Sequence, residues 1–188
     1  MKDAKKKYLE CWRYLKECRK QIFAAGIMLL TFVLIGYFYP VFFVEEIKEF
    51  IKELLLKTAG LNAFQMILFI FSNNLVVSFI GMSSGILFGI IPAVLAAANG
   101  YILGFVSQAA AGESGVLVLL KLLPHGIFEI PAVLISLGLG IKLGGSLFYK
   151  YRESVKILKK SLLVFLFVII PLLIIAGIIE GLLIIFFS

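Results

Sequence analysis

Most of the chain consists of long apolar runs, and its polar and charged residues collect in the stretches between them. Five runs have the length of a membrane-crossing helix: residues 21–44, 62–80, 86–110, 116–141 and 161–187. A helix needs roughly 20 apolar residues to cross the hydrocarbon core of a bilayer. The pattern therefore predicts an all-α, polytopic transmembrane bundle of about five spans, folded as a single domain over residues 21–188.

Two further segments carry apolar residues on one helix face only. In residues 1–20, Tyr8, Cys11 and Trp12 begin an apolar stripe among many Lys and Arg side chains. In residues 45–58, Ile47, Phe50 and Ile51 begin a similar stripe opposite Glu and Lys. Apolar positions that recur every three or four residues indicate amphipathic helices. We expect both helices to lie in the membrane interface, the first as a basic N-terminal helix.

Composition and charge exclude most other classes of protein. Of the 188 residues, 62% are hydrophobic and 15% are charged, against roughly 45–50% and about 25% in soluble domains. This excludes a soluble globule and a disordered chain, and five spans leave no room for a separate catalytic domain. The net charge is +7, but Lys and Arg flank apolar runs as membrane anchors do, so no nucleic-acid partner is expected.

The basic segments also predict how the chain is oriented in the cell membrane. Lys and Arg concentrate in residues 1–20 and 142–160, whereas residues 45–58 hold four Glu and three Lys. Basic segments beside membrane spans face the cytoplasm. Five spans satisfy this rule with a cytoplasmic N-terminus, an external C-terminus and residues 45–58 outside.

Glycine and proline mark the expected sites of helix packing and of a helix break. Small residues recur in and just before the third span, notably at Gly85, Gly89, Gly100 and Gly104. Such a ridge lets membrane helices approach closely, either within one chain or between two copies in a homo-oligomer. Pro124 and Gly126 predict a broken or re-entrant segment, because proline removes a backbone donor and glycine loosens the helix.

Six polar residues interrupt the apolar runs at similar depths: Asn73, Asn74, Asn99, His125, Glu129 and Glu180. An ionisable residue at the centre of a membrane helix costs roughly 2.5–3.5 kcal/mol, so such residues usually face the interior of a bundle. We therefore expect one interior polar cluster. Within it, His125 and Glu129 are four residues apart and share a helix face.

Three interpretations of this cluster stay open on the residues alone. It can be a structural hydrogen-bond network, a path for a proton or ion, or a site where His125, Glu129 and Glu180 bind a divalent metal such as zinc. The single histidine excludes a site with two histidines from one chain. Ser83 and Ser84 lack the partners of a serine hydrolase, so no catalytic residue is assigned. No cofactor is predicted, and the divalent metal is the alternative.

The polar and glycine positions together resemble the stage II sporulation protein M family of integral membrane proteins. The resemblance covers about residues 60–182, and its most specific part is the run Pro124-His125-Gly126 followed by Glu129. The other matching positions are Asn73, Asn74, Asn99, Gly100 and Glu180. The resemblance implies that these residues form the site of the protein.

The resemblance also implies a function. The family's namesake anchors a complex of peptidoglycan-degrading partners during engulfment and is not itself the hydrolase. We therefore expect a non-enzymatic membrane scaffold or assembly component, whose partners are the lipid bilayer and other membrane proteins, including those that remodel the cell envelope. The alternative is a small transporter or ion-coupled permease subunit that uses the buried His, Glu and Asn side chains. A metal-dependent intramembrane enzyme comes third.

Overall fold

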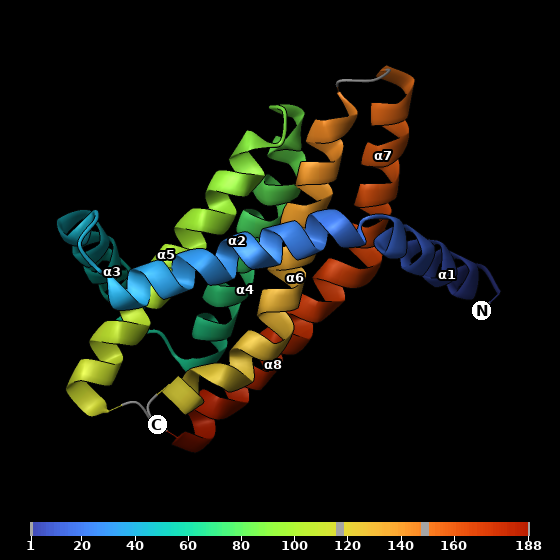
Figure 1. Ribbon diagram of the computed structural model, residues 1–188. Coiled ribbons are helices and arrows are strands. Elements are labelled where there is room, and N and C mark those ends of the chain that lie inside the picture. The colour runs from blue at the N-terminus through green and yellow to red at the C-terminus, as the bar shows by residue number, and fades with distance from the viewer. Residues whose placement is uncertain (1, 116–118, 148–150, 188) are drawn as a thin grey trace.

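The computed structural model is a bundle of long helices, and the residues it describes contain no strand (Figure 1). It describes the backbone of residues 2–115, 119–147 and 151–187, and the side chains of residues 5–112, 115, 126–147 and 152–179. In chain order the elements are α1 (Lys2–Glu17), α2 (Arg19–Phe38), α3 (Val44–Thr58), α4 (Ala63–Ser83), the 3₁₀ turn η1 (Ser84–Ile86), α5 (Ile90–Ser114), α6 (Leu119–Ser146), α7 (Tyr151–Val164), the π-helical turn η3 (Phe165–Ile169) and α8 (Ile170–Phe187).

Five of the helical segments are long and apolar enough to cross a membrane. They are residues Arg19–Phe38, Ala63–Ile86, Ile90–Gly112, Gly126–Ser146 and Arg152–Ile179. The predicted all-α fold with five spans is therefore confirmed. The helix of the first predicted span, α2, ends at Phe38, before the predicted end of that apolar run at residue 44. Pro40 explains the difference, because the residue before a proline avoids the helical region.

The break expected near Pro124 and Gly126 is wrong. Helix α6 runs from Leu119 to Ser146 without interruption, so both residues lie inside it. Pro124 lies near the start of the helix, where its missing N–H removes one hydrogen bond of the second turn. A complete break at membrane depth would leave several backbone groups unsatisfied in an apolar medium, which costs more than that single bond.

The basic segment 142–160 forms the end of a helical hairpin. Helix α6 continues to Ser146, and α7 begins at Tyr151. The hydroxyl of Ser146 donates to that of Ser154 across the hairpin at 3.1 Å. Residues 151–187 then stay helical through α7, η3 and α8, a length of about 55 Å against the roughly 30 Å of a hydrocarbon core. The hairpin therefore extends beyond the membrane-spanning part of the bundle.

A π-helical turn links α7 and α8. The N–H of Ile170 bonds to the carbonyl of Phe165, five residues back. Pro171 follows directly, and its ring would clash with the carbonyl four residues earlier in a regular α-helix. The wider turn relieves that clash while the helix continues.

Helix α6 lies at the centre of the bundle and contacts α2, α4, α5, α7 and α8. Helix α2 packs against α5 and α6 and is steeply inclined to the other long helices (Figure 1). The predicted ridge of small residues takes part in two separate helix contacts, one with α6 and one with α2. A Cβ at Gly85 would clash with the backbone of Gly140 in α6, and one at Gly104 would clash with the carbonyl of Val33 in α2. Glycine thus permits backbone-to-backbone contact at two separate crossings.

The basic helix α1 docks on the bundle with part of its apolar stripe. Cys11, Tyr14 and Cys18 are buried in the main hydrophobic core beside Val164 and Phe165. The hydroxyls of Tyr14 and Ser161 hydrogen-bond at 3.3 Å. Tyr8 and Trp12, on the same apolar side, remain exposed. Helix α1 therefore combines a protein-facing and an exposed apolar side.

Candidate functional site

Four of the predicted polar residues line one cavity of about 360 Å³ between α2, α4, α5 and α6. Helix α4 contributes Asn73 and Asn74, α5 contributes Asn99, and α6 contributes Glu129. We call this space the polar cavity. Its remaining lining residues are Leu29, Val77, Ile102, Leu103, Val106, Gly126, Ile130 and Val133.

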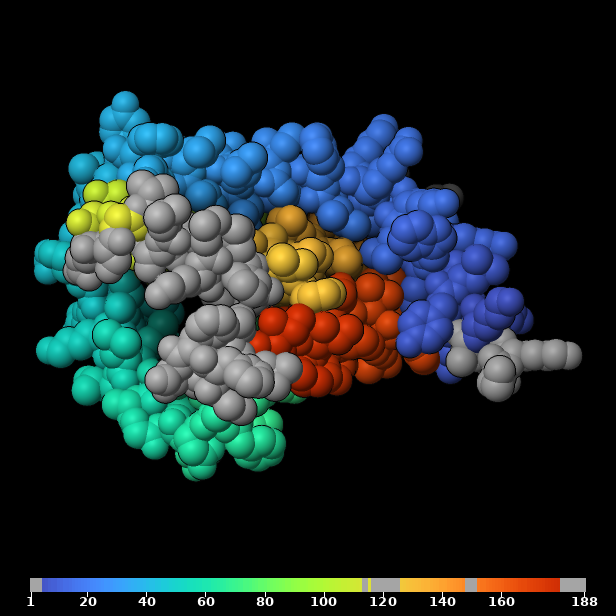
Figure 2. Space-filling view, turned by 90° about the horizontal axis from the view of Figure 1, so that it is seen from below, coloured from blue at the N-terminus to red at the C-terminus, as the bar shows by residue number. Residues whose placement is uncertain are grey.

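The polar cavity lies near the middle of the spans that form it. Asn74 lies within about 1 Å of the midpoint of the span 63–86, and Asn99 within about 3 Å of the midpoint of 90–112, at 1.5 Å per residue. Leu29 lies at the centre of α2. Seen from the lower end of Figure 1, α2 runs along one side of the molecule and α4 lies on the opposite side, with α6 and α8 between them (Figure 2). The polar side chains therefore gather at mid-membrane depth.

Helix packing explains why Asn99 lies beside the other polar residues. The next residue, Gly100, meets the backbone of Leu29 so closely that a Cβ there would clash with the Leu29 carbonyl oxygen. This contact fixes the rotation of α5 against α2. Asn99, Asn74 and Glu129 are all partly buried, whereas Asn73 is exposed at the outer edge. Apolar walls lower the local dielectric constant, so each polar interaction in the cavity is stronger than in water.

The side chains of His125 and Glu180 lie outside the described residues, as does that of Pro124. Their backbones belong to α6 and α8. Among the described side chains, no group of three His, Cys, Asp or Glu residues can hold a metal ion. Only Glu129 of the three predicted metal ligands is described, so the zinc prediction stays untested. Among the described residues, a Cβ on Gly126 would meet just the side chain of Ile130 in the same helix, and Gly126 lines the polar cavity.

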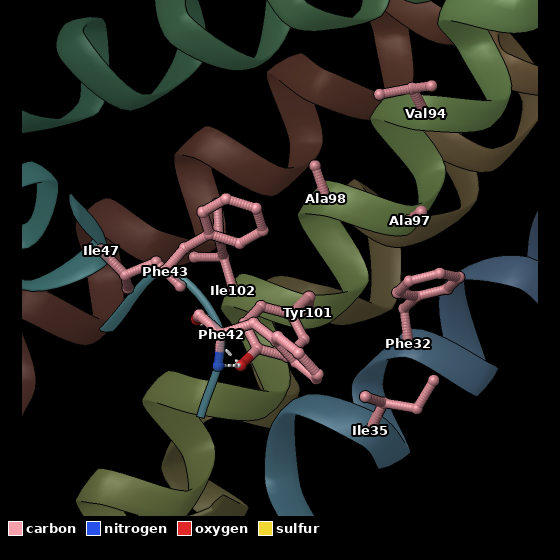
Figure 3. Close-up of a pocket in the computed structure, with 10 residues that line it drawn as sticks. All are labelled: Phe32, Ile35, Phe42, Phe43, Ile47, Val94, Ala97, Ala98, Tyr101 and Ile102. Carbon is pink, nitrogen blue, oxygen red and sulfur yellow. Dashed lines mark hydrogen bonds between the residues drawn. The ribbon is translucent and has the colours of Figure 1, made fainter. Parts of the chain in front are cut away.

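A second cavity, of about 510 Å³, is apolar and was not predicted from the sequence (Figure 3). It lies among α2, α3 and α5, and its one hydroxyl belongs to Tyr101. The N–H of Phe42 donates to that hydroxyl at 2.8 Å, and the hydroxyl donates to the Phe42 carbonyl at 3.0 Å. Tyr101 thus holds the connection between α2 and α3, in which Phe43 adopts a left-handed φ of 53°.

A groove of about 590 Å³ runs along the outer side of α4, and we call it the outer groove. It is lined by Lys57, Leu61, Gln65, Leu68, Phe69, Ser72, Asn73 and Val76. Gln65, Ser72 and Asn73 are exposed. The sequence contained a signal for this face, because Gln65 and Ser72 are seven residues apart and therefore share one side of a helix.

Comparison with known proteins identifies the family of the chain. The family model described as stage II sporulation protein M matches residues 22–183, which include every described residue of the polar cavity. The chain belongs to the stage II sporulation protein M family. The resemblance predicted from the sequence is confirmed.

One curated relative of the chain is a protein from Methanocaldococcus jannaschii, described as uncharacterized protein MJ0706. It is 36% identical over 124 residues, which cover 62% of this chain and 54% of the relative. The matching region therefore spans about half the length of that protein. No solved structure matches the chain.

Proposed function

We propose that this member of the stage II sporulation protein M family is a non-enzymatic membrane scaffold, an assembly component for other membrane proteins. The observation that supports the proposal is the outer groove. Ser72 and Asn73 are exposed near the middle of the span formed by α4. A membrane helix normally turns such side chains toward protein, because lipid offers them no hydrogen bonds.

The groove also indicates the chemistry of a partner. Side chains such as Ser and Asn form hydrogen bonds between membrane helices, and these bonds stabilise helix association. Lys57 lies at one end of the groove, outside the membrane-spanning part of α4. A partner suited to this surface is a transmembrane helix that carries a hydrogen-bonding side chain at mid-depth and an acidic residue near one end.

Site-specific photocrosslinking in native membranes tests the proposal. A photoreactive residue at position 72 is expected to give one discrete adduct, and the same probe at Leu30 is expected to give none. Leu30 is a suitable control because it is 58% exposed and lies on α2, away from the groove. The adduct should disappear in the Asn73→Leu variant. An adduct of twice the mass of the chain would identify the partner as a second copy, whereas equal crosslinking from both positions would contradict the proposal.

Transport is the second candidate, and the polar cavity supports it. Polar groups that gather at mid-depth are typical of substrate and ion sites in membrane transporters. The two functions respond differently to Glu129→Gln. A scaffold with an intact fold keeps its adduct at position 72. If the protein is a transporter, the Glu129→Gln variant loses substrate flux into proteoliposomes, while the helical content and the elution profile of the variant stay unchanged.

A further inference from the structure

We propose that a basic surface formed by α1 and α7 binds the headgroups of anionic phospholipids. The basic surface comprises the Lys and Arg side chains of residues 5–20 and 152–160. No residue of this surface lines the outer groove, so the proposal does not depend on the assembly role. The ligand class is a membrane lipid whose phosphate headgroup carries a net negative charge, such as phosphatidylglycerol.

The positive charge of the chain is concentrated in the two segments that form the basic surface. Residues 1–20 hold eight Lys and Arg against three acidic residues, and residues 142–160 hold six against one. The rest of the chain holds four against seven, so it has no positive excess of its own. Clusters of roughly four to eight basic residues beside a membrane span are typical of binding to anionic lipids.

The fold joins these two segments, which lie 147 residues apart in the sequence at one point of contact. There the hydroxyls of Tyr14 and Ser161 hydrogen-bond at 3.3 Å. Beside them, the ammonium group of Lys160 lies 3.5 Å from the carboxylate of Glu17 and 5.2 Å from the centre of the Tyr14 ring. Helix α1 projects sideways from the bundle where α7 meets η3 (Figure 1). The Lys and Arg side chains of both helices therefore adjoin each other on one surface.

The acidic residues of these segments do not cancel the positive charge. The carboxylate of Glu153 pairs with Lys156 at 2.8 Å within α7. Glu10 lines a cleft of about 330 Å³ between α1 and α7, together with Lys6 and Arg13 of its own helix. Each described carboxylate of the two segments thus has basic neighbours, and Lys and Arg remain in excess. An external anion is the group that can balance this excess.

Exposed apolar side chains favour a lipid over a water-soluble anion as the ligand. Tyr8 is 52% exposed, Leu9 48% and Trp12 58%. The ammonium group of Lys16 lies 5.3 Å from the centre of the Trp12 ring, so basic and apolar groups are interleaved on the outer side of α1. The membrane span of α2 begins at Arg19, directly after α1. A helix of this kind binds at the headgroup level through apolar burial and electrostatic attraction together.

Quenching of tryptophan fluorescence by brominated lipids tests the inference. Trp12 is the single tryptophan of the chain, so its emission reports the lipids beside α1 alone. The full-length protein is reconstituted in mixtures of phosphatidylglycerol and phosphatidylcholine, with bromine on one lipid or the other. We expect phosphatidylglycerol to be preferred beside Trp12 by at least about fivefold in relative binding constant at low salt. The preference should decline in about 1 M salt, where the Debye length is about 3 Å.

A pair of lysine substitutions in α7 shows whether both helices form the surface. Lys156→Gln combined with Lys159→Gln should lower the preference at Trp12 at least about twofold. The matched control is Lys48→Gln combined with Lys52→Gln in α3, which removes the same charge from exposed positions. Lys48, like Lys156, lies in an ion pair with a glutamate three residues earlier. The control should keep the preference of the wild-type protein.

Three results would overturn the inference. Equal quenching by the two brominated lipids at low salt would leave the basic surface to another partner, such as an acidic protein segment. A preference that does not change with salt would exclude headgroup charge as its cause. A preference that survives the α7 substitutions would show that α1 and α7 do not act together. The photocrosslinking experiment measures a different surface, so failure of the scaffold proposal leaves these results unaffected.

Discussion

Single glycines decide how closely α2 and α5 approach each other. A Cβ at Gly100 or Gly104 would clash with a carbonyl oxygen of α2, and a Cβ at Gly36 would clash with the carbonyl of Tyr101 in α5. Each obstacle is backbone, which cannot move aside as the end of a flexible side chain can. An added methyl group at any of these positions would therefore force α2 and α5 apart.

Gly104→Ala should destabilise the protein by about 1–3 kcal/mol, the usual cost of overpacking a well-packed contact. Gly112→Ala is the matched control, because it lies in the same helix and a Cβ there meets nothing within 4 Å. Thermal unfolding in detergent measures both. Equal stability of the two variants would mean that the close crossing of α2 and α5 is not formed.

Tyr101→Phe should loosen the connection between α2 and α3. The substitution removes the hydroxyl that accepts from the Phe42 N–H at 2.8 Å, and the loss of one such hydrogen bond costs about 1 kcal/mol. Faster hydrogen exchange at the Phe42 amide is the expected signature. Tyr37→Phe serves as the control, and an unchanged exchange rate in Tyr101→Phe would contradict the role assigned to the hydroxyl.

At this scale the sequence identified some residues and missed others, for physical reasons. Asn74, Asn99 and Glu129 stand out because polar groups are costly inside apolar runs. Tyr101 and Ser72 do not stand out, because Tyr and Ser are ordinary in membrane helices. Tyr101 has its role because α5 packs against the α2–α3 connection. Ser72 has its role because it lies on the outer side of α4.

Among the elements, α1 departs most from a simple surface anchor, because Cys11 and Cys18 are buried where it docks on the bundle. Burial raises the pKa of both thiols, so little reactive thiolate forms near neutral pH. Both cysteines should therefore react slowly with a water-soluble maleimide. The comparison is Trp12→Cys in a chain whose native cysteines are replaced by Ala, since Trp12 is 58% exposed. Equal rates would show that α1 does not dock.

The same two thiols give the stability of the protein a pH dependence. A raised pKa means that the folded state holds its thiol protons more tightly than the unfolded state. Their contribution is complete at neutral pH and declines as the pH rises above the ordinary thiol value of 9.0. Replacement of both cysteines by Ala should flatten the fall in thermal stability between neutral and alkaline pH. An unaltered profile would contradict this origin.

The sequence predicted the helices well and their interruptions poorly. Apolar runs of span length identify membrane helices because the bilayer sets their length. Interruptions depend on neighbours instead: Pro124 stays within α6, whereas Pro171 follows a π-helical turn. The charge pattern did not predict the helical hairpin over residues 142–160 either. Lys and Arg indicate that a segment is exposed to water, but both are also compatible with a helix that extends out of the membrane.

At the scale of the whole molecule, the charge distribution predicts a cytoplasmic N-terminus and an external C-terminus. Single cysteines at Arg152 in α7 and at Glu49 in α3 test this in intact cells, in a background without native cysteines. Both positions are exposed. An impermeant maleimide should label position 49 and leave position 152 unlabelled until the cells are opened. The reverse pattern would invert the topology.

Metal content also belongs to the whole molecule. A membrane scaffold needs no transition metal, so elemental analysis of the untagged protein should find well under one zinc per chain. His125→Ala should leave that result unchanged. About one zinc per chain, lost in His125→Ala, would instead favour the metal-dependent enzyme.

The steep inclination of α2 has a consequence for the surrounding lipid. Its 20 residues measure about 30 Å along the helix axis, which matches the hydrocarbon thickness only for an upright helix. An inclined α2 covers less of that thickness. The bilayer beside it must then thin, or Lys20 at one end and Tyr39 at the other must reach outward to the headgroups. The protein thereby has a short hydrophobic side at α2 and a long one at the continuous span Arg152–Ile179, and this asymmetry favours regions where membrane thickness changes.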